Sequence, residues 1–243
     1  MANETDAATT ALTRGLQDAL GDDLVALMLY GSTARGTQVP GRSDRNVLLV
    51  VRDASAATLR RASPALSAWA KAGHPPPLIQ TEADWAASAD VFPMEIEDIR
   101  EAHVVLAGRR DVISALVTTV ADQRRELERE ARAKLIRLRA EYAVAAHDGK
   151  VLAELLVRAL GTFLVLFRAA LRLTGAASPA DPVALVHAAA AAAGFDAAPF
   201  EWAIAARQAA KTPALKAFDP LAVGYLAGVE RLVGYVDGLK AES

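Results

Sequence analysis

The fold can be predicted from two segments, Tyr30-Gly31-Ser32-Thr33-Ala34-Arg35-Gly36 and Ser43-Asp44-Arg45-Asn46-Val47-Leu48-Leu49-Val50-Val51. An apolar run at residues 24–30 ends at the Gly31-Ser32 pair, and a second apolar run starts just after Asp44. This pattern indicates a strand, a turn and a second strand. Because glycine has no side chain, backbone amides and a serine hydroxyl at such a turn approach phosphate oxygens closely. We therefore expect Gly31 and Ser32 to bind phosphate, with Arg35 and Arg42 flanking the site in reach of a triphosphate and Arg35 as a further nucleotide-binding residue.

The second strand carries the candidate metal ligands. Asp44 and Asn46 point to the same face because side chains alternate along a strand, whereas Arg45 should point to the opposite face. A site for two divalent cations needs bridging anions, since two dications about 4 Å apart repel by roughly 17 kcal/mol at an effective dielectric constant of about 20. Asn46 is neutral. Asp44 with nucleotide phosphates would still hold a single Mg²⁺ weakly.

This arrangement resembles the DNA polymerase beta superfamily of nucleotidyltransferases, whose pattern is Gly-Ser, a short spacer, Asp-x-Asp in a strand and a third acidic residue on a later strand. The sequence Asp-Val-Phe-Pro-Met-Glu-Ile-Glu-Asp-Ile at residues 90–99, followed by His103, Leu106 and Gly108, resembles the later part of bacterial members in the minimal and aminoglycoside-modifying branches. The chain departs from the pattern at Asn46, which replaces the second aspartate, and at Arg45, where the family usually has an apolar residue.

The resemblance implies transfer of a nucleoside monophosphate from a nucleoside triphosphate to an acceptor hydroxyl, with Mg²⁺. It implies that Asp44 is catalytic and binds metal, that Asn46 is a weakened metal ligand, and that Glu95 completes the metal site or activates the acceptor. Two interpretations stay open: retained transfer with unusual metal use, or a catalytically inactive nucleotide-binding, antitoxin-like or regulatory protein. The acceptor is equally open among an antibiotic, a nucleotide, an RNA end and a protein hydroxyl.

The third acidic residue is predicted on a strand at residues 94–99. Glu95 and Glu97 would share one face of this strand and Asp98 would face the other way. Either glutamate fits the role, and the family position favours Glu95. His103 is expected in a helix after this strand, with a packing role.

Composition limits the classes of function. The chain has 243 residues, 53% of them hydrophobic, which is ample for a buried core. Its 27 basic and 29 acidic residues give a net charge of −2, which disfavours broad nucleic-acid binding. Cysteine is absent. The polar residues 1–10 lack a signal core, so we expect a cytoplasmic protein. The apolar segment 151–173 contains four charged residues and predicts a buried helix instead of a membrane span.

Strand-like alternation of apolar and polar residues ends near residue 112, and alanine and leucine dominate after it. This change predicts an α+β protein with two domains. A nucleotidyltransferase-like domain with a small mixed sheet is expected at residues 1–112 and an all-helical bundle at 113–243. An apolar face of the bundle would support a homodimer or a partner protein. The expected helices span residues 6–20, 54–72, a short segment from 82, 112–147 as one helix or two in series, 151–174, 182–193, 199–210 and 220–239, and a further strand spans 78–81.

Overall fold

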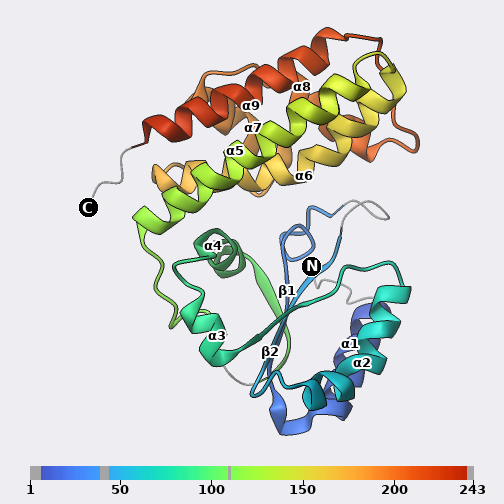
Figure 1. Cartoon of the computed structure of the whole chain (residues 1–243), viewed down its shortest axis with the longest axis vertical. Helices are drawn as coiled ribbons and strands as arrows, with labels where there is room; N and C mark the ends of the chain where they lie inside the picture. The colour runs from blue at the N-terminus through green and yellow to red at the C-terminus, as the bar shows by residue number, and fades with distance from the viewer. Residues whose placement is uncertain (1–6, 39–43, 109–110, 240–243) are drawn as a thin grey trace. The chain divides into compact units, whose positions relative to one another are not determined.

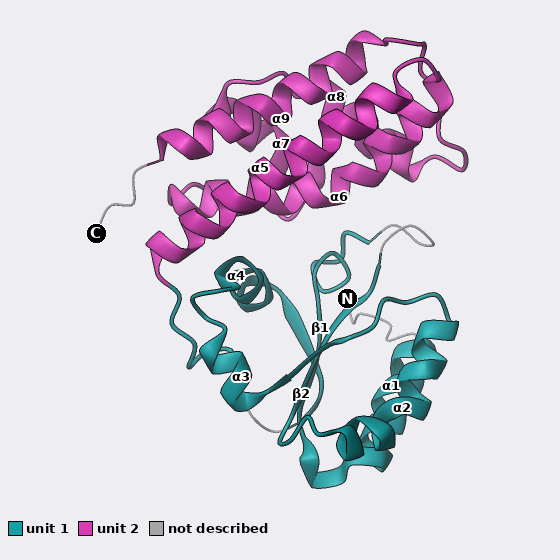
Figure 2. Ribbon diagram, in the orientation of Figure 1, with its two compact units in different colours: residues 1–118 teal, residues 119–243 magenta. Residues whose placement is uncertain are grey.

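A computed structural model describes residues 7–38, 44–108 and 111–239. The chain forms two compact units, residues 1–118 and residues 119–243, which we call unit 1 and unit 2 (Figure 2). Unit 1 contains a mixed four-stranded sheet with helices, and the described part of unit 2 is helical. The predicted α+β class is therefore confirmed. Contacts divide the chain between Thr118 and Thr119, somewhat beyond residue 112.

The sheet of unit 1 has the strand order β3-β2-β1-β4. The central strands pair antiparallel, as do β1 and β4, whereas β2 and β3 are parallel. Both central strands are almost wholly buried, which explains their continuous apolar sequences. The strands are β1 (Leu24–Tyr30), β2 (Asn46–Val51), β3 (Leu78–Thr81) and β4 (His103–Gly108).

Each face of the sheet has its own core. Leu27, Leu29 and Leu49 pack towards α1 (Ala7–Leu20) and α2 (Ala56–Lys71). On the other face, Met28, Leu48 and Val50 share a core with Trp85 of α3 (Glu82–Ala87) and with Ile96 and Ile99 of α4 (Pro93–Glu101). Figure 1 shows the two pairs of helices on opposite sides of the strands. Residues with the parity of Leu48 on β2, including Asn46, therefore lie on the α4 side.

One predicted element is wrong. Residues 94–99 belong to helix α4 and not to a strand, and the fourth strand is β4 instead. Pro93 stands in the first turn, where its fixed φ favours a helix, and the buried Ile96 and Ile99 have helical spacing. The period-two alternation that suggested a strand covers only four residues. His103 consequently begins a strand, which corrects its expected place in a helix.

Unit 2 is built from five described helices whose starts follow local sequence signals. Asp148, Asp181 and Asp219 each cap a helix by accepting hydrogen bonds from backbone amides, as expected for Asp181 and Asp219. The core of the bundle includes an aromatic cluster in which Phe200 contacts both Phe167 and Tyr225. The helices are α5 (Val120–Ala145), α6 (Gly149–Leu173), α7 (Pro182–Ala193), α8 (Ala198–Gln208) and α9 (Pro220–Gly238).

The turn between α5 and α6 is held by the segment that precedes α9. The Leu215 amide donates to the Gly149 carbonyl at 3.0 Å, and the Phe218 amide donates to the Ala146 carbonyl at 3.0 Å. A Cβ at Gly149 would lie 1.8 Å from the Leu215 carbonyl oxygen, so only glycine fits there. Among the described helices, none is long and apolar enough to cross a membrane.

Candidate functional site

The segment after β1 folds into a single helical turn. Gly31 opens it with a φ of 76°, in the left-handed region that glycine adopts without strain. Gly36, with a φ of 71°, closes it in the manner of a Schellman motif. The amides in the first turn of a helix point to one side, in the direction from which an anion can approach. Three backbone hydrogen bonds close the turn. The amides of Arg35, Gly36 and Thr37 donate to the carbonyls of Gly31 (3.1 Å), Thr33 (3.1 Å) and Ser32 (2.9 Å), respectively.

Gly31 and Asn46 lie against each other. Tyr30 pairs with Asn46 across β1 and β2, which brings the turn beside the start of β2. A Cβ at the buried Gly31 would lie 3.0 Å from the Asn46 Nδ2 atom. Ser32 is half-buried, and Asp44 is exposed just before β2. The structure thus brings together the candidate phosphate turn and the strand with the altered metal motif.

Arg45 faces the other side of the sheet, as predicted. Its Nη1 atom lies 3.3 Å from the Nε2 atom of His74. The His74 ring packs on Trp69 with ring centroids 4.1 Å apart, and Trp69 belongs to the core beneath α1 and α2. The arginine that replaces the usual apolar residue is therefore accommodated at the end of α2, away from the Asn46 side chain.

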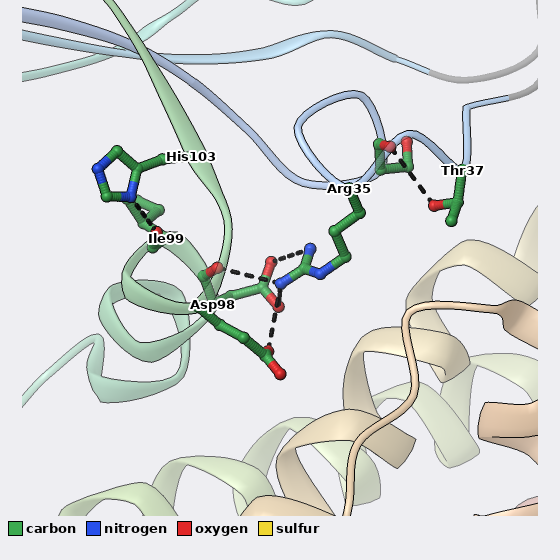
Figure 3. A network of polar contacts seen from close by, with 7 residues as sticks. Arg35, Thr37, Asp98, Ile99 and His103 are labelled. Atoms are coloured by element: carbon green, nitrogen blue, oxygen red, sulfur yellow. Dashed lines mark hydrogen bonds and ion pairs between the residues drawn. The ribbon is translucent and has the colours of Figure 1, made fainter. Parts of the chain in front are cut away.

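Arg35 connects the turn to α4 (Figure 3). Its Nη2 atom donates to the Asp98 Oδ1 atom at 2.7 Å and to the Asp98 carbonyl at 3.0 Å, and its Nη1 atom donates to Oδ2 at 3.2 Å. A longer contact of 3.4 Å reaches Glu101. Only 5% of the Arg35 side chain is exposed. Both terminal nitrogens thus hold the turn against α4. Arg42, the other candidate, lies outside the described residues.

Glu95 and Asp98 both act on Tyr30, the residue before the turn. Burial, together with the nearby carboxylates of Glu95 and Asp98, raises the pKa of the Tyr30 phenol to about 12. Three residues apart on a helix, Glu95 and Asp98 point to the same side. The expectation that Asp98 faces away from Glu95 is therefore wrong, because it assumed a strand.

Glu97 has a different environment from Glu95. It accepts hydrogen bonds from Arg100 and from the Thr118 hydroxyl, and 13% of its side chain is exposed. Glu95 is exposed. The predicted common face of the two glutamates is wrong, since residues two apart on a helix point in very different directions. Of the two, Glu95 is the one whose charge acts on Tyr30.

His103 forms a hydrogen bond with the end of α4. Its Nδ1 atom donates to the Ile99 carbonyl at 2.7 Å, which fixes the proton on that nitrogen. In Figure 3 the ring lies on the other side of β4 from Arg35. This contact fits the predicted packing role. Tyr30 and Asp98 lie next to the turn but were not among the predicted site residues. Recognition of Pro93 as a helix start would have placed Asp98 beside Glu95.

The donor set suits at most one hard cation. Within the described ranges, no group of three or more histidine, aspartate or glutamate side chains gathers to form a metal site. The motif supplies one carboxylate, Asp44, and one neutral amide, Asn46. Two adjacent dications would lack the anionic charge that must separate them. The residues therefore do not fit a two-metal centre, although one Mg²⁺ carried by a triphosphate is compatible with them.

Comparison with solved structures identifies the fold. The crystal structure of spectinomycin adenyltransferase AAD(9) from Enterococcus faecialis, with ATP and spectinomycin, superposes with a TM-score of 0.62 and 11% sequence identity. The match covers 95% of this chain and 98% of that one. No protein-family model matches the sequence, and no curated relative was found. The chain therefore shares the fold of that structure, which confirms the predicted fold.

Proposed function

We propose that unit 1 binds a nucleoside triphosphate with its phosphates against the Gly31-Ser32 turn, and that the site has lost most of its capacity for nucleotidyl transfer. The observation that carries this proposal is the contact between Gly31 and the Asn46 amide. It joins a turn suited to phosphate to a strand on which a neutral group replaces a carboxylate. The structural neighbour, which was solved with ATP, supports a nucleotide as the ligand.

Phosphate binding follows from the geometry of the turn. The single helical turn after Gly31 directs its first amides to one side, as helix starts that bind phosphate do. Ser32 adds a hydroxyl at the same place. Arg35 acts here by fixing the turn to α4, because its terminal nitrogens already bind Asp98 and Glu101. A direct contact between Arg35 and phosphate would require this network to open.

The site lacks part of the acidic ligand set that nucleotidyl transfer requires. Asp44 would hold a Mg²⁺ ion that arrives with the triphosphate, and the ion would supply positive charge against the phosphates. Asp44 supplies the retained carboxylate, Asn46 contributes only a carbonyl oxygen, and Glu95 is the candidate to complete the metal site or accept the proton of the acceptor. Retained transfer through one Mg²⁺ is the alternative. The acceptor hydroxyl stays unassigned, and an inactive regulatory or antitoxin-like role is the form that loss of transfer would take.

Calorimetric titration of the full chain with ATP, GTP, CTP and UTP, with and without magnesium, tests the proposal. We expect at least one triphosphate to bind without magnesium and pyrophosphate release to stay at the buffer rate. The Ser32→Ala variant should weaken binding by about tenfold, the effect of one hydrogen bond to a charged group. Absence of binding by all four nucleotides would overturn nucleotide recognition. Tight magnesium-dependent binding with pyrophosphate release would instead favour an active enzyme.

A further inference from the structure

Helix α4 has three faces, and each contacts a different part of unit 1. Residues three apart on a helix lie on the same side, so the nine residues of α4 divide into three sets. One set is fully buried on the sheet, and the two others flank it with polar contacts. The sets are Ile96 and Ile99 towards the sheet, Asp98 and Glu101 towards Arg35, and Glu97 and Arg100 towards residues 111–118, which we call the linker.

The face with Glu97 and Arg100 holds the linker, which leads into α5. Arg100 Nη2 donates to the Leu116 carbonyl, and the Thr118 hydroxyl donates to Glu97. Arg100 Nη1 also donates to Glu97, so the two α4 side chains act together. The next residue, Thr119, already caps α5, because its side chain accepts from the Asp122 amide at 3.1 Å. The chain thus passes directly from a residue bound to α4 to the start of unit 2.

The face with Asp98 holds the turn that starts at Gly31. Besides the Asp98 carboxylate, Arg35 binds the Asp98 carbonyl, at 3.0 Å (Figure 3). That carbonyl also accepts from the Ala102 amide at 3.2 Å, at the end of the helix. A cation is favourable at this end because the helix dipole places negative charge there. Arg35 therefore stabilises the same last turn of α4 that carries Arg100.

The length of α4 makes its order depend on these contacts. The helix has nine residues, and isolated helices shorter than about 12–15 residues are marginal in water. Phe92 at the N-cap position provides no side-chain hydrogen bond. Loss of the contacts on one flank should therefore loosen the helix and weaken the contacts on the other flank. The two flanks are linked through the order of α4, without any need for the helix to move as a rigid body.

We propose that α4 couples the Gly31 turn to the linker. A nucleotide that fixes the turn also fixes Arg35, and through Asp98 it stabilises the helix from which Glu97 and Arg100 hold the linker. By linkage, the contacts that hold the linker raise the affinity for nucleotide by the same factor. The nucleotide part rests on the proposed function, whereas the coupling between turn and linker is a property of the chain without ligand.

Amide hydrogen exchange of the full chain without ligand, followed by NMR, tests the coupling through Thr118→Val. This change removes the hydroxyl that donates to Glu97 and keeps the shape of the side chain. We expect the amides that close the turn, those of Arg35, Gly36 and Thr37, to exchange at least about threefold faster, which is part of the effect of one hydrogen bond to a charged group.

Two variants are matched controls for Thr118→Val. Ser114→Ala removes a hydroxyl of the same linker that donates to Asp111 instead of α4, and Thr118→Ser keeps the donor to Glu97. Both should leave exchange in the turn within about twofold of the wild type. Unchanged exchange in Thr118→Val, or an equal increase in Ser114→Ala, would overturn the coupling.

Calorimetric titration of the same variants with ATP tests the nucleotide part. The affinity of Thr118→Val should fall by at least about threefold, and that of both controls should stay within about twofold. If the wild type binds ATP and Thr118→Val binds it equally well, the coupling fails and the proposed function stands. If the wild type binds no nucleotide, the proposed function fails, and exchange in the turn decides the coupling.

Discussion

The Arg35 guanidinium lies against both carboxylate oxygens of Asp98, at 2.7 Å and 3.2 Å. The contact joins residues 63 positions apart in sequence and is almost closed to solvent, since the two side chains are 5% and 12% exposed. It ties the turn that starts at Gly31 to helix α4. A buried pair of this kind is costly to break from one side, because the remaining charge is left without compensation.

Asp98→Asn should therefore destabilise unit 1 by about 3 kcal/mol. Urea unfolding followed by tryptophan fluorescence measures this loss in a Trp202→Phe background, where the remaining Trp69 and Trp85 report on unit 1. Glu101→Gln is the matched control. Its contact with Arg35 is 3.4 Å long and its side chain is 35% exposed, so the change should cost about 0.5 kcal/mol or less. Equal losses in the two variants would show that the Asp98 contact does not hold the turn.

Gly31→Ala should weaken ATP binding by about tenfold as well as destabilise the fold by about 1 kcal/mol. The stability loss comes from the φ of 76°, and the loss of affinity comes from the new methyl group, which meets the Asn46 amide at 3.0 Å. Gly73→Ala has a similar backbone penalty, with a φ of 88° and no atom within 4 Å. It should cost a similar free energy of unfolding and leave ATP affinity unchanged. Affinity unchanged in Gly31→Ala would remove the turn from the nucleotide site.

Tyr30 makes the stability of unit 1 depend on pH in the alkaline range. Its pKa of about 12 in the folded chain lies above the ordinary value of 10.0, so folding favours the neutral phenol. This stabilisation is complete below pH 10 and is lost as pH rises towards 12, because the unfolded chain loses the proton first. Between these limits the free energy of unfolding should fall by about 2 kcal/mol more in the wild type than in Tyr30→Phe. Parallel pH profiles for the two proteins, measured by urea unfolding, would contradict the assignment.

Alanine substitutions at two glycines of unit 2 should change the stability of the bundle in opposite directions. Gly149→Ala should destabilise the bundle by about 3 kcal/mol or more, because its methyl group would overlap the Leu215 carbonyl and force the chain before α9 away. Gly234 lies inside α9 with no atom near its missing Cβ. Gly234→Ala should stabilise the bundle by up to about 1 kcal/mol. Thermal unfolding followed by circular dichroism measures both, and a Gly149→Ala protein as stable as the wild type would refute the close contact.

Local signals explain what was predicted well. Asp181-Pro182 and Asp219-Pro220 each contain a cap and a first-turn proline, so the starts of α7 and α9 were predicted to the residue. The place of Gly31 beside the start of β2 likewise follows from the predicted pattern of strand, turn and strand. These features need no knowledge of distant parts of the chain.

The wrong predictions concern segments whose structure depends on contacts with residues far away in the sequence. Residues 94–97 alternate like a strand but form the start of α4, whereas β4 depends on pairing with β1 at the edge of the sheet. The partner of Arg35 was not predictable either. A charged residue beside a glycine turn fits a phosphate ligand as well as a buried ion pair, and only the placement of α4 supplies Asp98. The sequence located the turn and the altered metal motif, but not how the turn is held.

The most direct test of the central claim is the dependence of ATP binding on magnesium, measured by calorimetry in the wild type and in Asn46→Asp. We expect the wild type to bind ATP with nearly the same affinity with and without magnesium. Asn46→Asp restores a second carboxylate beside Gly31, so its affinity should rise by about tenfold or more when magnesium is added. Strong magnesium dependence in the wild type, accompanied by pyrophosphate release, would contradict the claim that Asn46 has weakened the site.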